Sequence, residues 1–289
     1  MGAHGTYYIP NPSHWPLVAS TGLTTTLVGA ASWLHADWYG PYIFTLGLLI
    51  LVFMMFGWFG QVIYENEKGL YDSQVDRSFR WGMTWFICSE VFFFGAFFGG
   101  LFFSRYWTVP FLAGDVHPIN HYTLWPDFIN EWPLLKNPDN QIFVGAKEGM
   151  GAWGLAAINT MILLTSGVTI TWAHWALKFN KRLQLKIGMI CTIALGLLFL
   201  SLQAYEYHEA YTELGLTLDA GIYGTTFFML TGFHGLHVTI GTIMLIVILL
   251  RIIRGHFTPE RHFAFEAVAW YWHFVDVVWL FLFIFVYWL

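Results

Sequence analysis

The sequence has little charge and few cysteines. Asp, Glu, Lys and Arg make up 11% of the 289 residues, compared with about a quarter in a typical soluble domain. The two cysteines, Cys88 and Cys191, both lie in apolar stretches, so we expect neither a disulfide framework nor a cysteine-rich metal site. The formal net charge of -5 is modest and gives little indication of partners, among which we expect no nucleic acid.

Apolar and aromatic residues are abundant instead. Hydrophobic residues make up 57% of the chain and aromatic residues 20%, which is typical of a membrane protein. About twenty apolar residues are enough to cross a bilayer as a helix. The sequence therefore predicts an all-α, polytopic membrane protein with one membrane domain over residues 1–289. Seven spans are expected, at about 16–36, 40–65, 79–105, 149–177, 184–208, 220–250 and 259–289.

The loop charges predict the orientation of the chain. Ten of the thirteen Lys and Arg residues lie in or beside the loops on one side of the predicted spans, and the other three lie in or beside the loop 106–148. Basic loops face the cytoplasm or the equivalent compartment. We therefore expect the N-terminus inside and the C-terminus outside. The outer loop 106–148 is rich in proline and should consist of turns and short pieces, and the segment 205–220 should be an acidic outer loop.

Local signals mark some helix starts. Asp219 precedes the sixth span and is expected to cap its free N–H groups. Thr258 and Pro259 are expected to open the seventh span, as N-cap and first helical residue. Gly99 and Gly100 should weaken the third helix locally or allow a neighbour to approach closely.

Ionisable residues inside the predicted spans are the candidate functional residues, because such groups usually face the bundle and pair with one another. Glu90 lies roughly 15 Å from Arg80 along the third span, near the membrane midplane. His234 and His237 share one face of the sixth span. The sequence therefore predicts a polar cluster of Glu90, His234 and His237.

A second polar cluster is predicted on the seventh span. His273 and Asp276 are three residues apart, and Glu266 lies two turns before His273 on nearly the same face. Both clusters leave several interpretations open: histidines that bind heme or copper, a proton path through Glu90, a polar pocket for a partner or lipid, or polar groups that simply hold helices together. Spacing alone favours the last interpretation, because no set of four metal ligands converges.

Several longer motifs resemble subunit III of heme–copper cytochrome c oxidase. They are HWPLVAS at the start, RWGMTWFICSEVFFF around Glu90, LLTSGVTITWAHW on the fourth span, YGTTFFMLTGFHGLHVTIGT on the sixth, and HFAFEAVAWYWHFVDVVWLFLFIFVYWL on the seventh. Motifs of this length are highly specific. Seven spans also fit the cytochrome c branch of these oxidases better than the five-span subunit of the quinol oxidases.

The resemblance implies a fold and a role. It implies a two-helix bundle, about 16–65, and a five-helix bundle, about 79–289, with phospholipid in a V-shaped cleft between them. It implies an accessory subunit that stabilises the catalytic subunit I, supports proton uptake during oxygen reduction, and contacts the other oxidase subunits. Heme and copper belong to those partner subunits, and this chain is expected to contain no cofactor except structural phospholipid. Glu90 matches the family's buried, protonatable carboxyl group.

The resemblance also implies lipid contacts and a location. Arg251 matches a lipid-phosphate ligand of the family, and Arg80 and Trp58 are expected to contribute to lipid binding. Gly60 and Tyr64 stand where many relatives have arginine, so head-group contact from the second span should be weaker. The expected location is the bacterial inner membrane, with the mitochondrial inner membrane as the alternative. We expect no metal ligand among the following five histidines: His174, His208, His234, His237 and His273. The alternative function is a redox-metal or proton-channel protein that works alone.

Overall fold

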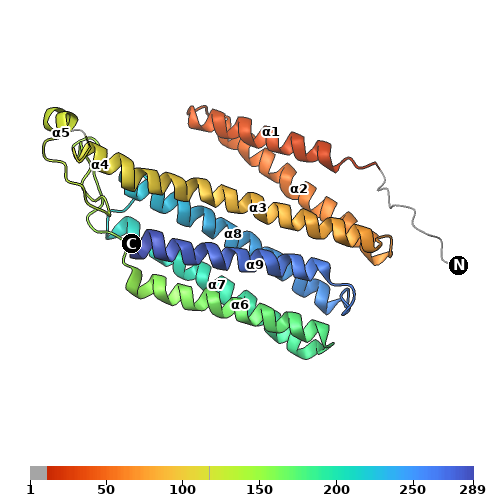
Figure 1. Ribbon diagram of the computed structural model, residues 1–289. Coiled ribbons are helices and arrows are strands. Elements are labelled where there is room, and N and C mark those ends of the chain that lie inside the picture. The colour runs from red at the N-terminus through yellow and green to blue at the C-terminus, as the bar shows by residue number, and fades with distance from the viewer. Residues whose placement is uncertain (1–11, 117) are drawn as a thin grey trace. The chain divides into compact units, whose positions relative to one another are not determined.

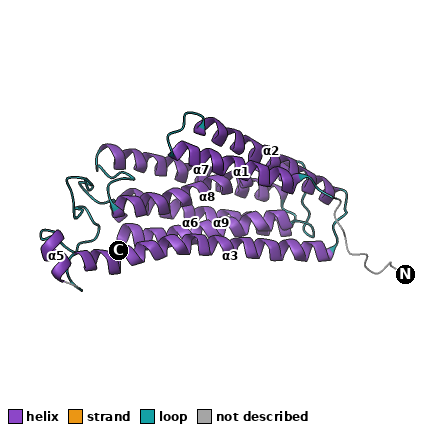
Figure 2. Ribbon diagram, turned by 90° about the horizontal axis from the view of Figure 1, so that it is seen from above, coloured by secondary structure: helices purple, strands orange, loops and turns teal. Residues whose placement is uncertain are grey.

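A computed structural model describes residues 12–116 and 118–289, and the regular elements in these ranges are all helical (Figures 1 and 2). The sidedness expected for the N-terminus concerns residues 1–11, which lie outside the described residues, and it stays a prediction. The elements are α1 (Trp15–Leu34), α2 (Gly40–Glu67), α3 (Ser73–Phe103), η1 (Ser104–Thr108), α4 (Val109–Leu112), α5 (Pro118–Leu124), η2 (Ala152–Ala156), α6 (Ala157–Lys178), α7 (Arg182–Thr212), α8 (Ile222–Ile253), α9 (Phe263–Leu282) and η3 (Phe283–Trp288), where η denotes a short π-helical turn.

The described residues contain seven helical segments that are long and apolar enough to cross a membrane, so the predicted seven spans are confirmed. The largest difference is in the third span, which runs over Ser73–Leu112 and begins six residues earlier than expected. Asp72 explains the early start, because its carboxylate accepts the backbone N–H groups of Gln74 and Val75 and so caps α3. α3 also continues through Gly99 and Gly100, and a Cβ added at either glycine would meet no described atom within 4 Å. No described residue therefore approaches this pair closely, and the expected local weakening of the helix stays a prediction.

The chain divides into two compact units, Met1–Trp81 and Gly82–Leu289. Within the first unit, α1 and α2 lie side by side (Figure 1). Glycines allow the close approach: a Cβ on Gly29 would collide with the backbone of Phe44, and a Cβ on Gly47 with the backbone of Thr26. Close backbone packing of this kind holds helices together in lipid. Lipid tails are as apolar as the side chains, so the hydrophobic effect does not drive the helices together there.

The second unit has its core among α6, α7, α8 and α9, which pack as neighbours around buried tryptophans. Trp272 on α9 donates its indole N–H to Ser166 on α6 at 2.8 Å, and Trp279 donates to Thr160 at 2.9 Å. Both tryptophans have no exposed surface. These hydrogen bonds satisfy the polar atoms of the large rings and fix the register between α6 and α9.

Two predicted helix starts are wrong. Asp219 does not cap α8; its carboxylate accepts the Thr217 hydroxyl, which lowers the pKa of Asp219, and α8 begins after Gly221 instead. Thr258 does not open α9, because its hydroxyl accepts the N–H of Arg261 in a separate turn and the helix begins at Phe263. In both cases a nearer partner in the loop competes with the helix for the capping side chain.

Of the two segments expected to be loops outside the bilayer, one agrees with the structure and one does not. Residues 113–151 contain only the short helix α5 and turns among the described positions, as the prolines predict. The acidic stretch after the fifth span is different. α7 continues through Thr212, so residues 205–212 are helical and not loop.

Candidate functional site

Glu90 on α3 is paired with His237 on α8. The two side chains are mostly buried, and Oε2 of Glu90 lies 2.9 Å from Nε2 of His237. Each residue is far from the ends of its helix: Glu90 is near the middle of the 40-residue third span and His237 near the middle of α8. The pair therefore joins two helices at the depth where an isolated charge is most costly.

The second nitrogen of His237 determines what the pair can do. Nδ1 lies 2.6 Å from the backbone carbonyl oxygen of Phe233. A carbonyl oxygen only accepts hydrogen bonds, so Nδ1 must carry a proton and donate it. In the neutral ring Nε2 then has a lone pair facing Glu90, and one proton must lie between Nε2 and Oε2. The pair consequently holds one shared proton and no net charge, whether that proton sits on the carboxyl group or on the imidazole.

Aromatic rings surround this pair. The centroid of the His237 ring lies 4.9 Å from that of Phe94 and 5.8 Å from that of Phe93, both on α3. Phe93 in turn packs edge-on against Phe233. Tyr271 on α9 stacks against His237 at 6.4 Å and donates its hydroxyl to the His237 carbonyl oxygen at 3.3 Å. The shared proton thus sits in an apolar, ring-lined environment.

His234 does not join Glu90, so the expected three-residue cluster is wrong. Its Nε2 donates to the backbone carbonyl of Val275 on α9 at 3.1 Å, and the side chain is fully buried. Residues three apart on a helix are rotated by about 60° from each other. His237 therefore faces α3 while His234 faces α9. Both histidines nevertheless form hydrogen bonds inside the bundle.

The predicted cluster of Glu266, His273 and Asp276 is also divided. Nδ1 of His273 lies 3.6 Å from Oδ2 of Asp276, as their spacing predicts, and its Nε2 lies 3.2 Å from the Thr171 hydroxyl. Glu266 is two turns away along α9, about 10 Å, which is too far for direct contact. Its partners come from elsewhere in the chain.

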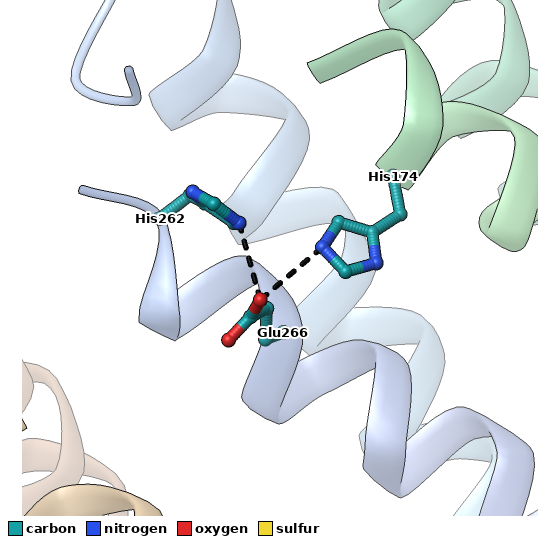
Figure 3. Close-up of side chains that lie close together, drawn as sticks. All are labelled: His174, His262 and Glu266. Atoms are coloured by element: carbon teal, nitrogen blue, oxygen red, sulfur yellow. Dashed lines mark ion pairs between the residues drawn. The ribbon is translucent and has the colours of Figure 1, made fainter. Parts of the chain in front are cut away.

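Glu266 forms a group with His174 and His262, and Figure 3 shows the three side chains pointing toward one another. His174 lies in the last turns of α6, His262 is the residue just before α9, and Glu266 lies in the first turn of α9. Oε1 of Glu266 is 3.4 Å from Nε2 of His174 and 3.1 Å from Nε2 of His262. The sequence analysis missed this group, because His262 was not considered as a candidate and His174 was not linked to any carboxylate.

Comparison with known proteins decides the family. The family model for cytochrome c oxidase subunit III matches residues 4–136 and 143–289. The chain belongs to the cytochrome c oxidase subunit III family. Proteins described as cytochrome c oxidase subunit 3 from Struthio camelus and Cyprinus carpio are 41% and 42% identical to it, each over 98% of this chain and 96% of the relative. The protein of the same description from Formosania lacustris is 43% identical over the same shares. Together with the seven apolar helices, the family makes this an integral membrane protein.

Three residues were expected to bind lipid in this member of the subunit III family, and their surroundings differ. Arg251, in the last turn of α8, is buried, and its guanidinium carbon lies 4.6 Å from the ring centroid of Phe257. Arg80 on α3 pairs with Asp76 at 2.8 Å. Trp58 on α2 keeps an exposed ring. Arg251 thus packs against an aromatic ring, and Arg80 pairs with a carboxylate one turn away.

A further buried carboxylate was missed in the predicted outer loop. Glu206 on α7 is 1% exposed, and its Oε2 accepts the hydroxyl of Tyr287 at 3.3 Å. Gln203, one turn earlier, is buried beside it on the same helix face. Helical spacing of Gln203, Glu206 and Ala210 could have revealed this face, but the acidic composition of the stretch favoured a loop.

Proposed function

We propose that this chain is an accessory, non-redox subunit of a proton-pumping cytochrome c oxidase. It is held beside the catalytic subunit I, which with its partner subunits supplies heme and copper and reduces oxygen. In that complex the chain stabilises the catalytic subunit and supports proton uptake during turnover. Membership of the subunit III family supports the proposal.

The hydrogen bonds of the Glu90–His237 pair lead to no further proton acceptor among the described residues. This is the observation that supports the proposal of a supporting role. A relay residue needs a donor on one side and an acceptor on the other. Among the described residues, the Glu90 side chain hydrogen-bonds only to His237. The other nitrogen of His237 ends at the carbonyl of Phe233, which passes no proton onward. The pair therefore joins α3 to α8 and keeps its proton.

Phospholipid binding at Arg251 is part of the proposal. A guanidinium offers paired, charge-assisted donors that match a phosphate, and its planar face can at the same time rest on an aromatic ring. The Phe257 ring holds Arg251 in this way. Arg80 and Trp58, which belong to the other compact unit, are proposed as lipid-binding residues of that unit. A phospholipid at Arg251 is a structural component of the subunit.

The proposed location is the inner membrane of a bacterium, or the mitochondrial inner membrane. The basic loops face the inner compartment, such as the one between α6 and α7 with Lys181 and, at the start of α7, Arg182. The proposed orientation therefore has the N-terminus inside and the C-terminus outside.

Purification of the chain tests the proposal. The chain carries an affinity tag and is isolated from native membranes in a mild detergent, and then again after a harsher detergent has separated the subunits. The first preparation should contain a catalytic subunit and show heme absorption, and the second, with the single chain, should show none. Heme or copper that stays with the single chain would indicate a redox protein working alone. A chain that copurifies with no heme-containing subunit would contradict the accessory role.

A further inference from the structure

His174, His262 and Glu266 gather at one end of the second unit, where α6 ends and α9 begins (Figure 3). Loop contacts hold this end together, since Arg182 at the start of α7 donates to the backbone carbonyl of Phe257 at 2.8 Å. The ligand-type atoms of the three side chains all lie within 4.8 Å of one another. All three side chains are largely buried, so the group is preformed and is not a set of flexible surface residues.

The orientation of His262 is the second observation. Its Nδ1 lies 3.2 Å from the backbone carbonyl oxygen of Thr258, which can only accept, so Nδ1 carries the proton. Nε2 of the neutral ring then points a lone pair at Oε1 of Glu266, 3.1 Å away. Two electron-rich atoms at this distance repel each other unless a proton or a metal ion lies between them, so the position suits either. A backbone carbonyl on the distal nitrogen is also how metal-binding histidines are usually oriented.

The two distances from Glu266 to the histidines fit a tetrahedral metal ion, and the two histidine nitrogens lie within 4.8 Å of each other. Zinc binds imidazole nitrogen at about 2.0–2.1 Å, so neighbouring ligand atoms of a tetrahedral site lie about 3.3 Å apart. The contacts from Glu266 Oε1 to the two histidines measure 3.1 and 3.4 Å. Two histidines and one glutamate are a known zinc ligand set, which leaves a fourth position for water.

Against the sequence-based expectation that His174 is not a metal ligand, we propose that His174, His262 and Glu266 bind a divalent transition-metal ion, with Zn²⁺ as the probe. The ion replaces the proton that otherwise neutralises the contact between the histidines and Glu266. Lys178 lies one turn after His174 and adds a positive charge near the site. We therefore assign the site to reversible binding from solution and not to permanent structural zinc. The site is separate from the Glu90–His237 pair and does not depend on the proposed function.

Zinc binding to the purified protein, with all subunits that accompany it, tests this site. Chelator-washed wild-type protein and the variants His262→Ala and His174→Gln are dialysed against the same series of free Zn²⁺ concentrations, and bound zinc is measured by mass spectrometry. His208→Gln is the matched control, because His208 is an exposed histidine on α7 outside the group. Wild type and control should bind one zinc more than either variant, whose affinity at this site should fall at least about 100-fold.

X-ray absorption at the zinc edge provides a readout that does not depend on the variants. Wild-type protein loaded with one equivalent should show two imidazole nitrogens and an oxygen at about 2.0–2.1 Å. Equal zinc uptake by wild type and both variants would overturn the proposal. If a variant fails to assemble, a wild-type spectrum without imidazole ligands would overturn it by itself.

Discussion

Glu90 and Glu266 both contact histidine, but they lie at different positions along their helices and have different neighbours. Glu90 lies in the middle of its helix, meets one histidine and is enclosed by aromatic rings. Glu266 lies in the first turn of α9 and meets two histidines beside the loops. In each group one histidine donates Nδ1–H to a backbone carbonyl and turns Nε2 toward the carboxylate. The same local arrangement thus occurs in two environments.

The comparison shows how the surroundings change the properties of the same histidine–carboxylate contact. One histidine and one carboxyl group are neutral with a single shared proton, and an apolar environment favours that state because it contains no isolated charge. A second histidine at the helix end adds a third ligand atom, and proximity to the loops gives an ion a way in. The first group therefore holds helices together, and the second can exchange its proton for a metal ion.

The largest effect should come from removing the histidine in the middle of the membrane. In His237→Phe the Glu90 carboxyl group stays buried without its partner. Loss of one member of a buried pair costs about 3 kcal/mol in the free energy of unfolding. SDS titration of the purified protein in mixed micelles should show this loss.

The double variant Glu90→Leu/His237→Phe is the matched control for that experiment. It removes both polar groups, so no buried group is left without a partner, and it should unfold closer to wild type than His237→Phe does. A double variant less stable than the single one would mean that shape, and not the shared proton, matters at this position.

The next largest effect should come from crowding the carboxylate of Asp276, which is also buried and also contacts a histidine. In Gly167→Ala the added methyl group would collide with Oδ2 of Asp276. Overpacking of this kind costs about 2 kcal/mol, and the same SDS titration would measure it. Gly235→Ala is the control, because no described atom lies within 4 Å of a Cβ at Gly235. Equal stability of the two variants would show that Asp276 can move away from α6 at little cost.

A smaller effect is expected at the helix end. His262→Gln removes one of the two histidines around Glu266, but His174 remains and the loops are near water. In metal-free buffer the loss of unfolding free energy should be about 1 kcal/mol, as for one hydrogen bond, because Glu266 keeps its contact with His174. A loss as large as that of His237→Phe would remove the contrast between the two groups.

The smallest effect should come from Tyr271→Phe. The Tyr271 hydroxyl only donates a long hydrogen bond of 3.3 Å to the His237 carbonyl. Its removal should lower the free energy of unfolding by about 0.5 kcal/mol. Oxygen consumption and proton pumping should equal those of the wild type. Altered pumping in Tyr271→Phe would place this hydroxyl in a proton path and would argue against a closed pair.

The sequence predicted the seven spans because each is a long apolar run, and it predicted that Glu90 meets a histidine of the sixth span because both lie at a similar depth. It did not separate His234 from His237, since the two face different neighbours and the positions of those neighbours follow from packing.

Partners that are distant in sequence were harder to predict. Glu266 shares a helix face with His273, and that spacing suggested a contact, but its observed partners are His174 on α6 and His262 in the preceding loop. The position of helix ends also had to come from the structure. Asp219 and Thr258 look like caps in the sequence, and each is engaged by a residue of its own loop.

The central claim is that the Glu90–His237 pair supports the complex and does not relay pumped protons. The direct measurement is the number of protons pumped per electron by the complex containing Glu90→Gln, reconstituted in sealed vesicles. Gln keeps the shape and part of the hydrogen bonding, so the ratio should equal that of the wild type, while the complex should lose activity over fewer turnovers. A ratio that collapses while all subunits remain assembled would make Glu90 a relay and would contradict the account.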